Sequence, residues 1–178
     1  MNITKTTILE TKRLYCQPFS ENDFQMLYAL HSTPEVGQIT IDGIQNQEQA
    51  LKELKHFIQH QSQYSYSQWM VFEKASHTFI GRGGFEYRQV NPAYPLQMEI
   101  RYALFPQFWG QGYATELAQG CLAWAYENIK PEKVVATANP VNYSSHRVLE
   151  KVGFVRGNDF EWRERVLAFF IHLPPRRA

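Results

Sequence analysis

The 178-residue chain has only two cysteines, Cys16 and Cys121, and neither has a cysteine or histidine at metal-ligand spacing. A disulfide framework and a metal site are therefore not indicated. The net charge of +1 excludes the basic excess that binds nucleic acid or an anionic membrane surface. No apolar run approaches the length of a membrane span and no signal-peptide pattern opens the chain, which predicts a cytoplasmic protein.

Apolar residues make up 44% of the chain and aromatic residues 15%, enough for a packed core. Apolar residues recur at a spacing of two in some segments, typical of strands, and of 3.6 in others, typical of helices. These segments predict the order β-α-α-β-β-β-α-β-α-β-β, without an internal repeat. We therefore expect one mixed α/β domain over residues 1–178.

Three segments allow predictions about local structure. Residues 31–45 have few apolar anchors and predict a loop of the length that is often functional. In the helix predicted from Asn46 to about Tyr64, His56 and His60 are four residues apart, but no third ligand is near, so we expect solvated surface histidines. Three glycines within the strand Phe79–Tyr87 predict a bulge or a close backbone approach.

The most informative stretch, Phe105–Glu116, contains Gln107-x-x-Gly110-x-Gly112. An apolar strand precedes it, and apolar residues at helical spacing follow it to about Asn128. Two glycines at such a turn let the backbone approach a ligand closely, and the first helical turn leaves its N–H groups unpaired. The stretch therefore predicts a phosphate site, with a plain tight turn as the alternative on these residues alone.

Three segments resemble the GNAT superfamily of N-acetyltransferases. The Gln-x-x-Gly-x-Gly string resembles its acetyl-CoA pyrophosphate loop. Asn139–Phe154 is similar to the Asn-x-x-Ser…Glu-Lys-x-Gly-Phe signature, and Glu10–Leu14 is similar to the Glu-Thr-x-Arg-Leu opening. Together with Trp109–Glu116, these segments resemble the ribosomal-protein (RimJ/RimL-like) branch. The resemblance implies a GNAT-like domain with acetyl-CoA as cosubstrate. It also implies a twisted, mostly antiparallel central sheet of six to seven strands, with a splayed central strand pair and about four flanking helices.

The resemblance also implies a cofactor site. The backbone N–H groups that would hold the pyrophosphate belong to Gln107, Phe108, Trp109, Gly110, Gln111, Gly112, Tyr113 and Ala114. The end of the central strand, with Tyr102, Leu104 and Phe105, would pair with the pantetheine amides like an added strand. Asn142 would hydrogen-bond the pantetheine arm, with Ser145 in the same turn. Helix capping is the alternative role for both residues.

In this family the acceptor amine attacks the thioester directly in a ternary complex. The backbone N–H near Leu104 would stabilise the oxyanion. Many members protonate the thiolate with a tyrosine four residues before the Gly-Phe pair, but this chain has Leu149 there. We expect Ser145 to be the acid instead. Tyr143 and unassisted departure are the alternatives.

Glu99, at the head of the central strand, is the first candidate for the general base. The alternative is a solvated residue at a strand end. Glu86 and His146 are poorer candidates, and His146 is expected to face solvent. Glu116 matches a family position, but a carboxylate in a first helical turn favours the helix dipole in any case.

The predicted acceptor is a primary amine, first of all a protein or peptide N-terminal α-amine. A polyamine or drug is the alternative acceptor, and Leu149 motivates a third hypothesis, a non-catalytic acyl-CoA-binding module. The 31–45 loop, the turn at 88–96 and the final hairpin are expected to line the acceptor cleft. A homodimer would be unsurprising for the family, whereas nucleic-acid and membrane partners are not expected.

Overall fold

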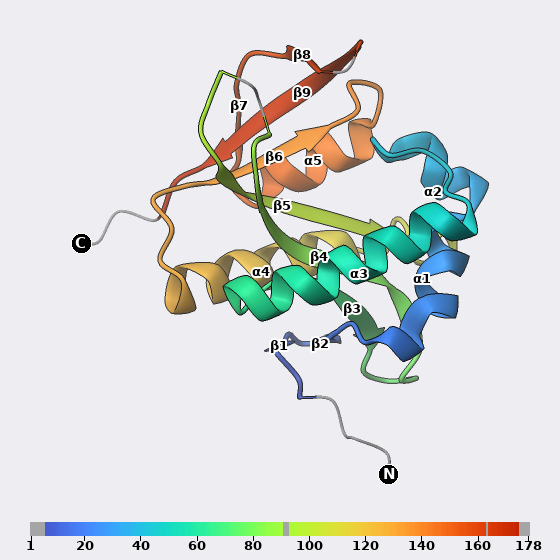
Figure 1. The fold of residues 1–178 in the computed structure, drawn as a ribbon. Coiled ribbons are helices and arrows are strands. Elements are labelled where there is room, and N and C mark those ends of the chain that lie inside the picture. The colour runs from blue at the N-terminus through green and yellow to red at the C-terminus, as the bar shows by residue number, and fades with distance from the viewer. Residues whose placement is uncertain (1–5, 91–92, 163, 175–178) are drawn as a thin grey trace.

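The computed structural model describes residues 6–90, 93–162 and 164–174. Within them one sheet has the strand order β1-β2-β3-β4-β5-β6-β9-β7, with β8 paired to β9 (Figure 1). Its neighbouring strands are antiparallel except for β5 and β6, which are parallel. The strands are β1 (Leu9–Glu10), β2 (Leu14–Pro18), β3 (Gln68–Glu73), β4 (Phe79–Arg88), β5 (Gln97–Leu104), β6 (Val134–Ala138), β7 (Val155–Arg156), β8 (Phe160–Trp162) and β9 (Arg165–His172).

Helices cover both faces of the sheet (Figure 1). They are α1 (Phe24–His31), α2 (Pro34–Ile39), α3 (Gln47–Tyr64), α4 (Tyr113–Asn128) and α5 (Tyr143–Lys151), with 3-10 turns η1 (Glu21–Asp23) and η2 (Pro106–Phe108). On the α3 face, Leu54 and Phe57 pack on Met70. On the α4 face, Leu117 and Cys121 join the largest apolar cluster. None of these helices combines the length and apolar character that crossing a bilayer requires.

The predicted mixed α/β sheet is confirmed, with more elements than the pattern showed. Strands β1 and β7 have only two residues each, too few for an alternating pattern to reveal, whereas the predicted last strand pair is present as β8 and β9. The loop prediction for 31–45 was wrong over α2. Pro34 occupies the first helical turn, where its missing N–H costs nothing. Ile44 packs so closely against Gly37 that a Cβ there would be 2.3 Å from its Cγ1.

The prediction of two solvated histidines on α3 was wrong for His60. Only 4% of His60 is exposed. Its Nε2 accepts from the N–H of Tyr87 at 2.8 Å, so Nδ1 is the nitrogen that donates to the Tyr66 carbonyl, also at 2.8 Å. Burial lowers the pKa of His60. His56 is half-exposed and pairs with Glu86. Among the described residues no group of three side chains could hold a metal.

The predicted close approach at the glycines of β4 is confirmed. A Cβ on Gly81 would lie 2.2 Å from the Ala103 carbonyl oxygen, and one on Gly84 would lie 2.2 Å from the Ser67 carbonyl oxygen. Both glycines also have positive φ, 153° and 147°. At both positions the close contact and the positive φ therefore each require glycine.

We expect Gly84→Ala to destabilise the protein by about 3 kcal/mol, because backbone strain adds to a clash with a carbonyl that cannot move aside. Gly43→Ala is the control. Its φ is also positive, at 73°, but nothing lies within 4 Å of its Cβ position, so strain alone would cost about 1 kcal/mol. Urea unfolding measures both changes. Equal losses in the two variants would contradict the close-approach argument.

Candidate active site

The parallel strands β5 and β6 separate after a single bridge between Glu99 and Val135. Beyond this bridge the two strands diverge toward their C-terminal ends (Figure 1). A cavity of about 410 Å³ occupies the gap, walled by β5, β6, the first turn of α4, α5 and α2. The predicted splayed pair is therefore present, and it opens a passage from one face of the sheet to the other.

Most of the predicted site residues meet at this cavity. Its wall includes Tyr102, Leu104, Phe108, Trp109, Gly110, Gly112, Tyr113, Ala114, Asn142 and Ser145. Four of the predicted residues are not part of the wall, namely Glu99, Phe105, Gln107 and Gln111. From the segment predicted as the 31–45 loop, Val36, Ile39, Thr40 and Ile41 also reach the wall.

The end of β5 turns one backbone edge toward the gap. The N–H of Phe105 donates to the Ile80 carbonyl on β4 at 3.0 Å. Because alternate residues of an antiparallel strand face the same partner, the N–H groups of Tyr102 and Leu104 point the other way, into the gap. The indole N–H of Trp109 donates to the Leu104 carbonyl at 2.8 Å. This edge has the direction that an oxyanion donor at Leu104 requires.

The glycine-rich turn offers fewer phosphate donors than the sequence predicted. Within η2, the N–H of Phe108 donates to Phe105 and that of Trp109 donates to Pro106, both at 3.0 Å. These two N–H groups already have partners within the protein, so they are not available to a phosphate. Gly110 and Gly112 have φ of 73° and 79°, and a Cβ on Gly110 would meet only open space. The predicted donor set therefore loses Phe108 and Trp109. The other predicted N–H groups, including those in the first turn of α4, stay predictions.

A carboxylate clamp, which the sequence did not reveal, ties this turn to the N-terminal motif. Oε1 of Glu116 accepts from the Thr11 hydroxyl at 2.6 Å and from the Arg13 N–H at 2.7 Å, while Oε2 accepts from Arg13 Nε at 2.6 Å. Arg13 Nη1 also donates to the Gln111 carbonyl at 2.9 Å. The two motifs, about a hundred residues apart, therefore form one unit around Glu116.

The clamp keeps Glu116 ionised at neutral pH. Partial burial would raise its pKa, but the hydrogen bonds from Thr11 and Arg13 and the nearby guanidinium lower it on balance. A fixed negative charge at a helix N-terminus also favours the helix dipole. Glu116 therefore does more than favour the helix dipole. Through Arg13, it also anchors the glycine-rich turn.

Asn142 is used by the protein at both ends of its amide. Its Oδ1 accepts from the Ser145 N–H at 3.1 Å, which caps α5, and its Nδ2 donates to the Ile39 carbonyl at 3.1 Å. The capping alternative is therefore present. Because an amide has two N–H donors and two acceptor lone pairs, the bond to pantetheine remains compatible with these contacts and stays a prediction.

Ser145 lies in the wall with its hydroxyl 2.9 Å from that of Tyr102. Burial raises the pKa of Tyr102, so its phenol stays protonated. Leu149, at the family's tyrosine position, is buried against the same cavity. A phenol is therefore present in this site, but it comes from β5 rather than from α5.

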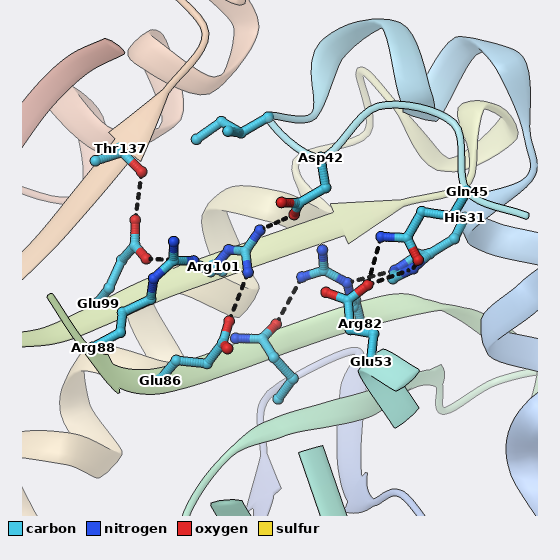
Figure 2. A network of polar contacts seen from close by, with 12 residues as sticks. His31, Asp42, Gln45, Glu53, Arg82, Glu86, Arg88, Glu99, Arg101 and Thr137 are labelled. Carbon is cyan, nitrogen blue, oxygen red and sulfur yellow. Dashed lines mark hydrogen bonds and ion pairs between the residues drawn. The ribbon is translucent and has the colours of Figure 1, made fainter. Parts of the chain in front are cut away.

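Charged side chains form a buried network on the α3 face (Figure 2). Arg101 donates to Glu86 at 2.7 Å and also pairs with Asp42, and Arg82 donates to His31 at 2.8 Å. Burial alone would raise the pKa of Glu86, but Arg101 and His56 lower it. Glu86 therefore stays ionised, which makes it a poor proton acceptor.

Glu99 is not the solvated strand-end residue that we considered, because only 1% of it is exposed. Its Oε1 accepts from the Thr137 hydroxyl, and Arg88 Nη1 lies 3.5 Å from Oε2. Burial raises its pKa. His146 is also buried rather than facing solvent, with Nε2 3.1 Å from the Asn139 carbonyl.

A parallel strand pair thus separates beside a glycine-rich turn at a helix N-terminus, an arrangement that can hold an extended, phosphate-bearing cosubstrate. The chain belongs to the acetyltransferase (GNAT) domain family, which matches residues 13–155. It is therefore an acetyl-CoA-dependent N-acetyltransferase, and acetyl-CoA is its cosubstrate.

Comparisons with individual proteins agree with this assignment. An uncharacterized N-acetyltransferase of Bacillus subtilis, YnaD, is 27% identical over 153 residues, covering 86% of this chain and 85% of the relative. The RimL ribosomal L7/L12 alpha-N-protein acetyltransferase, solved with coenzyme A, is 15% identical with a TM-score of 0.78, covering 94% of this chain and 98% of that one. The spermidine N-acetyltransferase from Vibrio cholerae, solved with CoA and spermine, is 16% identical with a TM-score of 0.70, covering 92% and 96%. These two proteins share the fold of this chain, but their names give different acceptors, a ribosomal protein and spermidine.

We expect Glu116→Gln to weaken acetyl-CoA binding roughly tenfold, because the neutral amide loses the charge-assisted bonds that hold Arg13 against the turn. The Michaelis constant for the acceptor should stay unchanged. Glu127→Gln, an equal charge change at the exposed end of α4, is the control. Calorimetry measures the binding. Equal acetyl-CoA affinity in the two variants would show that the clamp has no part in shaping the turn.

Proposed function

We propose that the enzyme acetylates the N-terminal α-amine of a protein or peptide, as the RimJ/RimL-like motifs predict. The observation that carries this proposal is the charge of the cavity wall. Among the residues that the structure describes, no aspartate or glutamate lines the wall, whereas Arg82, Arg101, Arg147 and Lys151 do. Because Glu86 and Asp42 offset the charge of Arg101, the positive charge of the wall rests mainly on the other three.

This wall suits an acceptor with a single amine. Two like charges 4 Å apart repel by about 4 kcal/mol at an effective dielectric constant of 20. A polyamine or an aminoglycoside would bring several such charges to the wall. A peptide N-terminus brings only one, and it loses that charge before it attacks. Its neutral backbone can then lie along the apolar residues contributed by α2 and the segment after it.

We place the pyrophosphate on the turn after Trp109 and the pantetheine along the gap-facing edge of β5. There the N–H of Leu104 donates to the carbonyl oxygen as it becomes an oxyanion. The amine approaches from the α3 face, where Glu99 is the base. Ser145, backed by the Tyr102 hydroxyl, protonates the departing thiolate.

The alternatives make different demands on the same site. A small-molecule acetyltransferase for polycations would need carboxylates at the acceptor end, and the described wall has none. A non-catalytic acyl-CoA-binding module was suggested by Leu149, but the hydroxyls of Ser145 and Tyr102 supply the missing donor from other positions. Both observations support a catalytic site for a simple amine.

Calorimetry with acetyl-CoA tests the cofactor site. We expect Gly110→Asp to weaken binding by roughly a hundredfold, because its carboxylate would project where the phosphates bind. Gly43→Asp is the matched control, since both glycines have φ of 73° and open space around them, but Gly43 lies outside the cavity wall. A Gly110→Asp protein that folds and binds like wild type would remove the turn from the cofactor site.

An acceptor screen tests the proposed amine. We expect CoA release with short peptides that carry a free N-terminus, and at least tenfold lower kcat/KM with spermidine, because of the cationic wall. The same peptides with a blocked N-terminus and one internal lysine are the control. Faster turnover of spermidine than of every peptide would favour the small-molecule alternative. Tight acetyl-CoA binding without turnover would favour the binding module.

A further inference from the structure

Glu99 is buried and does not line the cavity. It is the third residue of β5 and forms the one bridge to β6, at Val135, from which the strands separate. It is not part of the cavity wall, and 1% of it is exposed. A base at this position needs an intermediary that reaches the cavity.

Thr137 is placed to be that intermediary. It lies two residues beyond Val135, so its side chain points to the same α3 face, and it forms part of the cavity wall. Its hydroxyl donates to Oε1 of Glu99 across the start of the splay (Figure 2). One atom, Oγ1 of Thr137, therefore joins the cavity to the buried carboxylate.

The groups around Glu99 leave it able to take a proton. Arg88 approaches Oε2 from β4 at 3.5 Å but makes no hydrogen bond with it, and Oε2 is buried. Arg101 on the same strand is already paired with Glu86 and Asp42. Glu86, directly opposite Glu99 on β4, adds a negative charge that also disfavours the ionised form of Glu99.

We propose that Thr137 relays the proton of the acceptor ammonium to Glu99, an inference that rests on the proposed acetyltransferase function. The ammonium gives one proton to Oγ1 of Thr137, which passes its own proton to Oε1 of Glu99. The free amine then forms a bond to the thioester carbon, and the C–S bond breaks. Ser145 gives its proton to the departing thiolate and is reprotonated by the second proton of the nitrogen, so the products are the amide and CoA thiol. Glu99 later releases its proton to solvent.

Two substitutions of Thr137 test this relay. We expect Thr137→Val, which keeps the shape and removes the hydroxyl, to lower kcat roughly a hundredfold. Thr137→Ser, which keeps the hydroxyl, should stay within about threefold of wild type. Glu99→Gln should match the valine variant, and the two losses should not add, because both changes interrupt one proton path.

The pH dependence separates a relay from a packing role. In wild type, kcat/KM should rise with pH through the pKa of Glu99, because only the ionised carboxylate accepts a proton. In Thr137→Val, where the path to Glu99 is interrupted, this rise should be lost, as in Glu99→Gln. A variant that only disturbs packing should keep the rise. All three variants should remain folded at the assay temperature, as thermal unfolding checks, and their acetyl-CoA affinity should stay unchanged. Thr137→Ala replaces the valine variant if that protein does not fold.

Each result decides one question. A Thr137→Val enzyme within threefold of wild type, or a Thr137→Ser enzyme as slow as the valine variant, would overturn the relay and leave the proposed function intact. A wild-type protein that binds acetyl-CoA but acetylates none of the amines in the screen would overturn the proposed function, and the relay with it.

Discussion

The separation of β5 from β6 is the constraint on which the rest of the site depends. Each of these strands has a full partner on its outer side. β4 pairs with the whole of β5, from Gln97 to Leu104, and β9 pairs with the whole of β6, from Val134 to Ala138. The separation therefore leaves unpaired only the inner edges of two strands that are otherwise fixed. The Trp109 indole takes up one freed carbonyl, and the cosubstrate has the others to pair with.

The alternation of β5 then distributes the chemistry between the two faces. Tyr102 and Leu104 belong to the α4 face, where the Tyr102 hydroxyl meets Ser145. Glu99 and Arg101 belong to the α3 face, where the carboxylate meets Thr137 and the guanidinium anchors Asp42. In the mechanism that we propose, one strand thus positions the donor for the leaving thiolate on one side of the sheet and the acceptor for the amine proton on the other.

The sequence pattern predicted those features that a few neighbouring residues determine. The glycine turn after β5, the start of α4 and the close approaches along β4 follow from backbone geometry that only a few neighbouring residues set. The clamp on Glu116 could not be predicted in this way, because Thr11 and Arg13 are about a hundred residues away and no pattern records which carboxylate they reach. The burial of His60 and of Glu99 was missed for a related reason. A polar residue on a helix or strand reads as solvated unless the partners that satisfy it are known, and here they come from distant elements.

The contrast between Glu86 and Glu99 shows how the fold assigns different roles to identical groups. The two carboxylates face each other across β4 and β5, and both are buried. Glu86 accepts from Arg101 and His56, and these hydrogen bonds and charges outweigh the cost of burial and keep it ionised. Glu99 has one hydroxyl donor and an arginine beyond hydrogen-bonding reach, so burial prevails and its pKa rises. Paired carboxylates whose pKa values are driven apart in this way divide structural and proton-accepting roles between them. Arg101 is held between Glu86 and Asp42, so it lowers the pKa of Glu99 too little to offset burial, and this supports the proton-accepting role that we propose for Glu99.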